Sequence, residues 1–272
     1  WRQGVYRIPE GLAGLVGTHY LFDERHDSNS DGYRARTAFE RYMAEDLGLR
    51  VASSHDYGIT SCRWAAFASG IGTIRRNNFF YGDHGSWYAL VAFLVDKEME
   101  YTCTSTHKPC SDNCNLCVKH CPVGALAEPY ATCGVACASF LTNKAPDNGM
   151  FEKYAPQIGS WIYGCDVCQD VCPFNKDQRS GEKEFPGLEE LSEFISLEKI
   201  VTMDYACLRE LFTAKFWYIE AKDLWKWKRN ALSALRNTGH KNYEVLLTAA
   251  LHDEDERIRN LAAKALAAKS DA

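Results

Sequence analysis

Two short runs of cysteine constrain this chain more than any other feature. The first run reads Cys110-x3-Cys114-x2-Cys117-x3-Cys121-Pro122, and the second reads Cys165-x2-Cys168-x3-Cys172-Pro173. Both runs end in the Cys-Pro of bacterial ferredoxins, in which one tight loop supplies three thiolates to the closely spaced iron corners of a cubane. The fourth corner points away from that loop, so the next cysteine leads toward a second cluster. The spacing therefore predicts a ferredoxin-like module that binds two [4Fe-4S] clusters and moves electrons.

The crossover of the fourth cysteine assigns ligands to the two clusters. The first cluster is expected to take Cys110, Cys114, Cys117 and Cys172. The second is expected to take Cys121, Cys165, Cys168 and one cysteine from the connecting segment, either Cys133 or Cys137.

Some cysteine assignments stay open at this point. The gap after Cys110 is one residue longer than usual, and Cys103 lies nearby in the sequence. Units of the type C-x2-C also bind zinc, although a zinc pair would not explain two Cys-Pro endings with crossover spacing. Disulfides are disfavoured because the chain is long enough to bury a core without them. Cys62 and Cys207 are expected to be small buried side chains rather than ligands.

The remaining sequence divides into three parts. Residues 1–100 are predicted to be an α/β domain, with a helix over residues 34–47. The cysteine-bearing residues 101–180 have little helical periodicity, whereas residues 181–272 have a helical period, with helices predicted over 225–235, 243–251 and 257–267. The fold class is therefore α+β and multidomain. The last helices are typical either of a HEAT-type repeat or of a plain helical hairpin.

A second candidate site lies in the first part of the chain. Gly70 and Gly72 let a backbone approach a bulky ligand, and Arg76 and Asn77 follow them with groups that could hold a phosphate or an amide. This pattern is weak by itself, because a Gly-x-Gly segment is more often a tight turn and this one lacks the third glycine of a dinucleotide site.

The order of these segments resembles the epoxyqueuosine reductase family, cobalamin and iron–sulfur enzymes of queuosine tRNA modification. Asp56 stands at the family's distance before the segment that begins at Gly70, and Gly85-Ser86-Trp87 follows. The residues of 163–173 match the family's Tyr-Gly-Cys-Asp-x-Cys-Gln-x-Val-Cys-Pro almost one for one, and those of 229–235 are similar to its Arg-Asn-Val-Leu-Ile-Ala-Leu.

This chain departs from the family pattern in the first domain. The family's Asp-x-Ala-Pro is Asp56-Tyr57-Gly58-Ile59 here, its Trp is Thr73 and its Gly is Arg75. These departures fall on the corrin and substrate pocket. They leave the substrate more open than the cofactors.

The resemblance implies a cobalamin-binding first domain, a ferredoxin-like double-cluster module and a HEAT-like tail. It favours Cys137 over Cys133 and makes Asp56 the candidate general acid for loss of the epoxide oxygen of the modified base. The candidate cobalamin-binding residues are Gly70, Gly72, Arg76, Asn77, Ser86 and Trp87.

The sequence also predicts the partners and the location of the protein. The net charge of −5 argues against bulk nucleic-acid binding, but a local basic stretch could contact tRNA phosphates through Lys226, Lys228, Arg229, Arg236 and Lys241, with Trp225 and Trp227 interleaved. An external donor such as ferredoxin or flavodoxin would supply electrons. The longest apolar stretch, residues 85–95, is too short to span a bilayer, so we expect a cytoplasmic protein.

Three alternatives concern the protein as a whole. The first residue, Trp1, suggests a member that lacks its N-terminal part. A paralogue that performs another cobalamin-dependent reduction, such as reductive dehalogenation, would account for the altered pocket residues. A non-catalytic electron-transfer subunit of a larger complex would need only the clusters.

Overall fold

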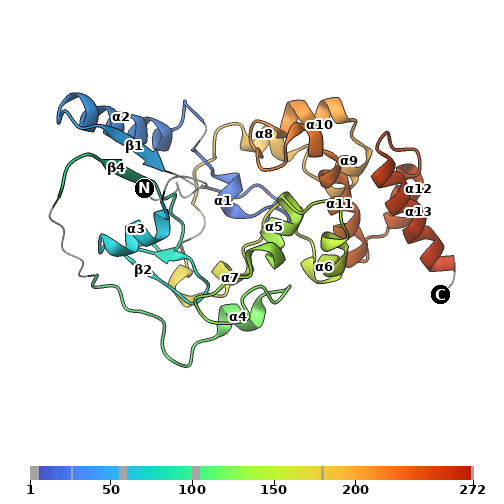
Figure 1. Cartoon of the computed structure of the whole chain (residues 1–272). Helices are drawn as coiled ribbons and strands as arrows, with labels where there is room; N and C mark the ends of the chain where they lie inside the picture. Colours follow the sequence, from blue (N-terminus) through green and yellow to red (C-terminus); the bar gives the residue numbers. More distant parts are fainter. Residues whose placement is uncertain (1–5, 26, 55–59, 100–104, 179–180, 271–272) are drawn as a thin grey trace.

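The computed structural model describes residues 6–25, 27–54, 60–99, 105–178 and 181–270. They form a mixed fold rich in helices, drawn in Figure 1. The first half carries α1 (Thr18–Leu21), α2 (Asp31–Glu45), β1 (Val51–Ser54), α3 (Cys62–Ala68), β2 (Thr73–Ile74), β3 (Phe80–Tyr81), β4 (Ala92–Val95) and α4 (Leu116–His120). The middle carries η1 (Gly134–Ala136), α5 (Ala138–Asn143), α6 (Met150–Ile158), α7 (Val167–Asp170) and η2 (Pro173–Asn175). The tail carries α8 (Leu188–Ser192), α9 (Leu197–Thr202), α10 (Tyr205–Phe212), η3 (Ala221–Asp223), α11 (Trp225–Asn237), α12 (Tyr243–Ala250) and α13 (Glu256–Ser270).

The strands of the first part form two separate antiparallel pairs within the described residues. β1 pairs with β4, with Val51 opposite Val95, and β2 pairs with β3, with Thr73 opposite Tyr81. Both pairs are antiparallel, whereas an α/β domain is built on a mostly parallel sheet. The coarser prediction of mixed helices and strands is confirmed, while the α/β layout of residues 1–100 is not what these strands form.

The predicted helices match the structure closely. The helix expected over residues 34–47 is α2, and the three expected in the tail are α11, α12 and α13. Ser30 caps α2, because its side chain accepts a hydrogen bond from the backbone nitrogen of Tyr33. Among the described helices, none is both long and apolar enough to cross a membrane.

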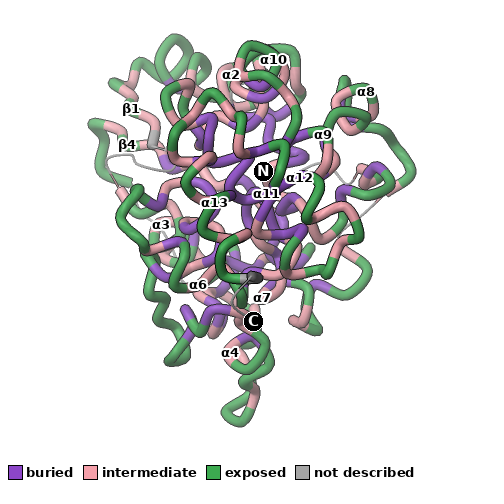
Figure 2. Tube along the Cα trace, turned by 90° about the vertical axis from the view of Figure 1, so that its right-hand side faces the viewer, coloured by how far each residue is buried: buried purple, intermediate pink, exposed green. Residues whose placement is uncertain are grey.

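The largest hydrophobic core joins the beginning of the chain to its tail. Leu12 and Val16 belong to the same buried cluster as residues of α9 to α13. Tyr163 stacks on Trp227 of α11, with ring centroids 5.0 Å apart and 5° between the planes. A second, smaller core lies in the cysteine-bearing middle of the chain. Figure 2 shows that the buried trace concentrates around α11, whereas α4 lies at an exposed end.

Helix α11 connects the two cores. Ten of its thirteen residues are buried, including Arg229 and Asn230. The side-chain nitrogen of Asn230 donates to the carbonyl oxygens of Thr142 and Ile162, each at 2.8 Å. Arg229 Nη2 donates to the carbonyl oxygen of Leu141 at 3.0 Å. These bonds satisfy backbone groups that would otherwise be buried without partners.

Replacing Asn230 with leucine should lower the free energy of unfolding by about 2–4 kcal/mol, because two buried carbonyl oxygens lose their donor. Anaerobic urea unfolding measures the change. Asn237→Leu is the matched control: Asn237 also donates to two carbonyl oxygens, those of Ala155 and Gly159, but it is only partly buried. Water can replace its bonds, so its loss should stay below about 1 kcal/mol. Equal losses in the two variants would contradict the role given to Asn230.

Candidate iron–sulfur and cofactor site

The structure brings the cysteines of the first predicted set together. One small cavity is lined by Cys110, Cys114, Cys117 and Cys172. Cys117 lies on α4 and is buried, and Cys172 comes directly before η2, so packing of α4 against α7 joins the two parts of the set. Cys103, the alternative to Cys110, lies outside the described residues.

The cysteines of the second predicted set also meet at one cavity. It has a volume of about 500 Å³, and its lining includes Cys121, Cys137, Cys165 and Cys168. Cys121 Sγ accepts a hydrogen bond from the backbone nitrogen of Ala125 at 3.2 Å. The competing Cys133 is exposed and does not line this cavity. The arrangement therefore suits Cys137 better than Cys133 as the fourth thiolate.

Burial makes four of these thiols, those of Cys117, Cys137, Cys165 and Cys168, weaker acids. It raises the pKa of the Cys165 thiol to about 12. It also raises the pKa of the Cys117, Cys137 and Cys168 thiols, and neighbouring sulfurs of the same set add to the rise because thiolates repel one another. Since iron binds thiolates, loading such a site would release protons and stabilise the fold around it.

Asn77 lies between the two sets of cysteines. Its side-chain nitrogen donates to the hydroxyl of Tyr81 at 2.8 Å and to the carbonyl oxygen of Cys168 at 3.0 Å. The residue lines both cysteine cavities. Arg76 lines only the first, and its Nη2 donates to the carbonyl oxygen of Asp112 at 2.7 Å. These predicted cofactor residues thus belong to the cysteine sites.

The Gly-Ser-Trp segment docks onto the same module. Ser86 Oγ donates to Gln169 Oε1 at 2.7 Å, and the backbone nitrogen of Ser86 donates to Asn175 Oδ1 at 2.8 Å. A Cβ atom at Gly85 would lie 2.3 Å from Asn175 Oδ1, and the backbone there has a φ of +72°. Only glycine fits so close an approach, which ties the first part of the chain to the cysteine loops.

A larger cavity opens beside this segment. It has a volume of about 610 Å³, and its lining includes Ser86, Trp87 and Gln169. Trp87 is buried, and its indole Nε1 has no hydrogen-bond partner in the structure. Buried donors without partners are uncommon, so this one is available to a polar group of a ligand. Arg63 and Phe79 line both this cavity, hereafter the Trp87 cavity, and the cavity of the second cysteine set.

The two predicted glycines serve the backbone instead of lining the Trp87 cavity. Gly70 follows the end of α3 with a φ of +73°, a conformation that ends helices. A Cβ atom at Gly72 would lie 2.2 Å from Phe80 Cζ, so glycine is needed for β2 to pack on β3. Asp56 lies outside the described residues, but Thr60, four positions later in the sequence, lines the Trp87 cavity.

Other residues of the Trp87 cavity were not expected from the sequence. His19 and Arg25 line it, and Arg25 Nη2 lies 2.7 Å from Asp23 Oδ2 in a buried ion pair. An acid and a base two positions apart are common on surfaces, so nothing in the sequence marked this pair as buried. Cys62 is half-buried and also lines the cavity, whereas Cys207 is exposed, so the expectation that both are buried was wrong.

The basic stretch of the tail does not form the predicted face. Lys226, Lys228 and Arg229 are at most 5% exposed, and so are the interleaved Trp225 and Trp227. Lys228 Nζ lies 2.6 Å from Asp253 Oδ2 in a buried ion pair. Other parts of the protein surround α11, so its charged residues are buried together with its apolar ones. The amino-acid composition of the helix did not indicate this.

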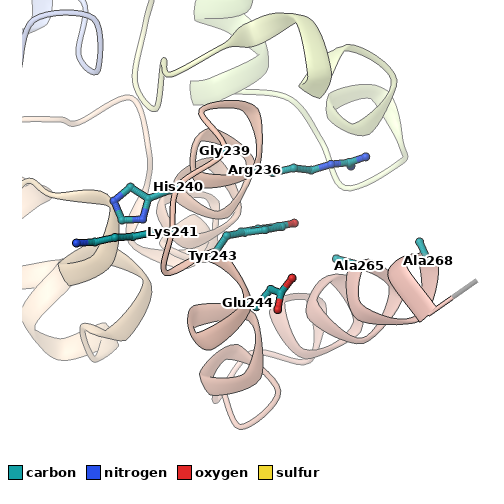
Figure 3. Close-up of a pocket in the computed structure, with 8 residues that line it drawn as sticks. All are labelled: Arg236, Gly239, His240, Lys241, Tyr243, Glu244, Ala265 and Ala268. Carbon is teal, nitrogen blue, oxygen red and sulfur yellow. The ribbon is translucent and has the colours of Figure 1, made fainter. Parts of the chain in front are cut away.

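The exposed residues of that basic stretch, Arg236 and Lys241, point in different directions (Figure 3). Arg236 and Lys241 line a cavity of about 390 Å³ near the end of α11. Figure 3 shows that Arg236 points to the opposite side from His240 and Lys241, and that the carboxylate of Glu244 lies at the same cavity. They do not make one continuous basic surface.

Comparison with known proteins identifies the family. The model described as "4Fe-4S double cluster binding domain" matches residues 110–175. The epoxyqueuosine reductase of Prochlorococcus marinus (strain NATL2A) is 32% identical over 259 residues, covering 87% of this chain and 81% of that protein. The chain belongs to the epoxyqueuosine reductase family. The epoxyqueuosine reductase of Synechococcus sp. (strain CC9605) is 27% identical over 240 residues, covering 86% of this chain and 65% of that protein.

Solved epoxyqueuosine reductases share the fold. A crystal structure with a tRNA-Tyr epoxyqueuosine-modified tRNA stem loop is 26% identical, with a TM-score of 0.69 over 86% of this chain and 61% of that one. The Bacillus subtilis structure, whose catalytic aspartate loop is swung out of the active site, is 25% identical, with a TM-score of 0.73 over 97% of this chain and 69% of that one. The family resemblance found in the sequence is confirmed, and the double-cluster match favours iron–sulfur clusters over the zinc alternative.

The choice between Cys133 and Cys137 can be measured directly. After anaerobic reconstitution the unaltered chain and Cys133→Ala should each hold about eight irons, four for each cluster, because the exposed Cys133 is not needed. Cys137→Ala should lose about half of the iron and sulfide. Full iron in Cys137→Ala together with loss in Cys133→Ala would reverse the assignment.

Proposed function

We propose that this protein is a cobalamin-dependent iron–sulfur reductase that converts epoxyqueuosine in tRNA to queuosine. The observation that carries the proposal is the presence of two four-cysteine sets, the second of which shares a wall with the Trp87 cavity, in a chain of the epoxyqueuosine reductase family. When bound, the clusters supply single electrons and cobalamin supplies the strongly reducing cobalt that removes an epoxide oxygen.

The two cysteine sets would hold one [4Fe-4S] cluster each. We assign Cys110, Cys114, Cys117 and Cys172 to the first cluster and Cys121, Cys137, Cys165 and Cys168 to the second. The donor chemistry fits, since each set offers four cysteine sulfurs at one cavity, and iron–sulfur clusters are held by four cysteine thiolates. Asn77 lines both sites.

The Trp87 cavity would hold part of the cobalamin. Two observations support a large polar ligand there: the unpartnered indole nitrogen of Trp87, and the wall of Arg63 and Phe79 shared with the cavity of the second cysteine set. Ser86 keeps Trp87 in position through its bonds to Gln169 and Asn175. Gly70 and Gly72 would contribute by shaping the segment that carries these residues.

Asp56 would supply the proton for the departing oxygen. Opening of the epoxide to an alkene consumes two electrons and two protons, and the oxygen leaves as water. A carboxyl group placed beside the oxygen can act as the general acid if burial keeps it protonated. Two features support this role: the family's spacing between Asp56 and Gly70, and the aspartate catalytic loop of the Bacillus subtilis enzyme.

The substrate would be the anticodon stem loop of a queuosine-type tRNA, and an external donor such as ferredoxin or flavodoxin would reduce the clusters. The related enzyme with a bound epoxyqueuosine-modified stem loop supports the choice of RNA.

The proposal is tested with the anaerobically reconstituted chain, cobalamin, a chemical reductant and an epoxyqueuosine-modified RNA stem loop. Mass spectrometry of the released nucleosides should show the loss of one oxygen. Asp56→Asn should slow the reaction by about 10²–10⁴-fold while RNA binding is retained, because only proton transfer is removed. Asp83→Asn, an exposed carboxylate of the same part of the chain, should leave the rate unchanged.

Two outcomes would overturn the proposal. Turnover of a halogenated compound with none on the RNA would indicate a paralogous reductase. Full cluster content without any bound corrinoid, after growth with cobalamin supplied, would indicate an electron-transfer subunit.

A further inference from the structure

Arg75 is a buried cation without an acidic partner. Its side chain is 4% exposed, and neither Nε nor Nη1 has a hydrogen-bond partner in the structure. Among the ion pairs of the described residues, none involves Arg75. Taking a guanidinium out of water without a counter-charge is costly, so such a group calls for a negative charge that the protein atoms alone do not supply.

The surroundings of Arg75 fix its side chain. Its backbone nitrogen donates to the carbonyl oxygen of Phe79 at 3.0 Å, and its carbonyl oxygen accepts from Asn78, so the residue belongs to the turn between β2 and β3. The guanidinium carbon lies 3.2 Å from the ring centroid of Phe174 and 5.1 Å from that of Tyr81. Arginine suits this stacked, weakly hydrated setting better than lysine does.

The negative charge that Arg75 lacks would come from the first cluster site. Arg75 lines the same small cavity as Cys110, Cys114, Cys117 and Cys172. Four thiolates around a [4Fe-4S] cubane leave a net negative charge, which grows when the cluster gains an electron.

We propose that Arg75 is the internal counter-cation of the cluster held by Cys110, Cys114, Cys117 and Cys172, and that it raises the reduction potential of that cluster. Net charge and burial around a cluster set its potential, and a fixed cation stabilises the reduced form more than the oxidised form. The inference rests on the ligand set assigned above. It concerns a feature of this chain, because the family pattern has a glycine at this position.

The two cysteine sets have different surroundings. The cysteines of the first set lie beside α4, whose Lys119 and His120 are exposed, whereas the second set shares its wall with the Trp87 cavity. A higher potential makes the first cluster easier for an external donor to reduce.

The test compares Arg75→Met with Arg75→Lys in the cluster-loaded full chain. Methionine keeps most of the bulk that packs on Phe174 and removes the charge, while lysine keeps the charge. Redox titration followed by electron paramagnetic resonance measures the midpoint potential of each cluster. The midpoint potential of the first cluster should shift to a more negative value in Arg75→Met. The shift should be smaller or absent in Arg75→Lys.

Lys119→Gln is the matched control. It removes the same charge two residues from Cys117, but Lys119 is exposed and therefore screened by water. The midpoint potentials of the clusters in Lys119→Gln should stay close to those of the unaltered protein. Unchanged potentials in Arg75→Met, or an equal shift in Lys119→Gln, would overturn the proposal.

Iron analysis separates this inference from the ligand assignment. About eight irons in the unaltered chain support two clusters, whatever Arg75 does. Loss of half of the iron in Arg75→Met, with full iron in Arg75→Lys, would show an even stronger dependence of the cluster on the charge. Loss of iron in both variants would contradict a role of charge and indicate packing instead.

Discussion

The carboxamide of Asn230 is the interaction on which the rest of the structure depends. It is completely buried, and it donates to the carbonyl oxygens of Thr142 and Ile162. Thr142 lies near the end of α5, the short helix that begins beside Cys137, and Ile162 lies three residues before Cys165. One side chain of α11 therefore positions two segments that carry thiols of the second set. The tail therefore stabilises segments that carry the second set of thiols, although it contributes no thiol to either set.

A second network attaches the first part of the chain to the same module. Ser86 bonds to Gln169 and Asn175, and Asn77 reaches the carbonyl oxygen of Cys168. These polar contacts are buried and mutually satisfied, a condition under which such networks specify one arrangement. They hold the Trp87 cavity against the second set of thiols through contacts between segments that are about 90 residues apart in sequence.

Local features of this protein could be predicted from its sequence, and non-local ones could not. Cysteine spacing indicated the two metal sites because one loop supplies most of the thiols, and apolar periodicity located α11 to α13 within a few residues. The burial of Lys226 and Lys228 depends on Asp223 and Asp253, which pair with them, and no periodicity shows that. The short antiparallel strands and the stacking of Arg75 on Phe174 likewise arise from distant contacts.

Anaerobic purification after growth with cobalamin supplied, followed by iron, sulfide and cobalt analysis of one sample, measures how many clusters and corrinoids the chain holds. We expect about eight irons and about eight sulfides with about one cobalt per chain, because the chain would hold two cubanes and one corrinoid. About four irons would contradict the pair of cysteine sites. Full iron with no cobalt would contradict the role given to the Trp87 cavity.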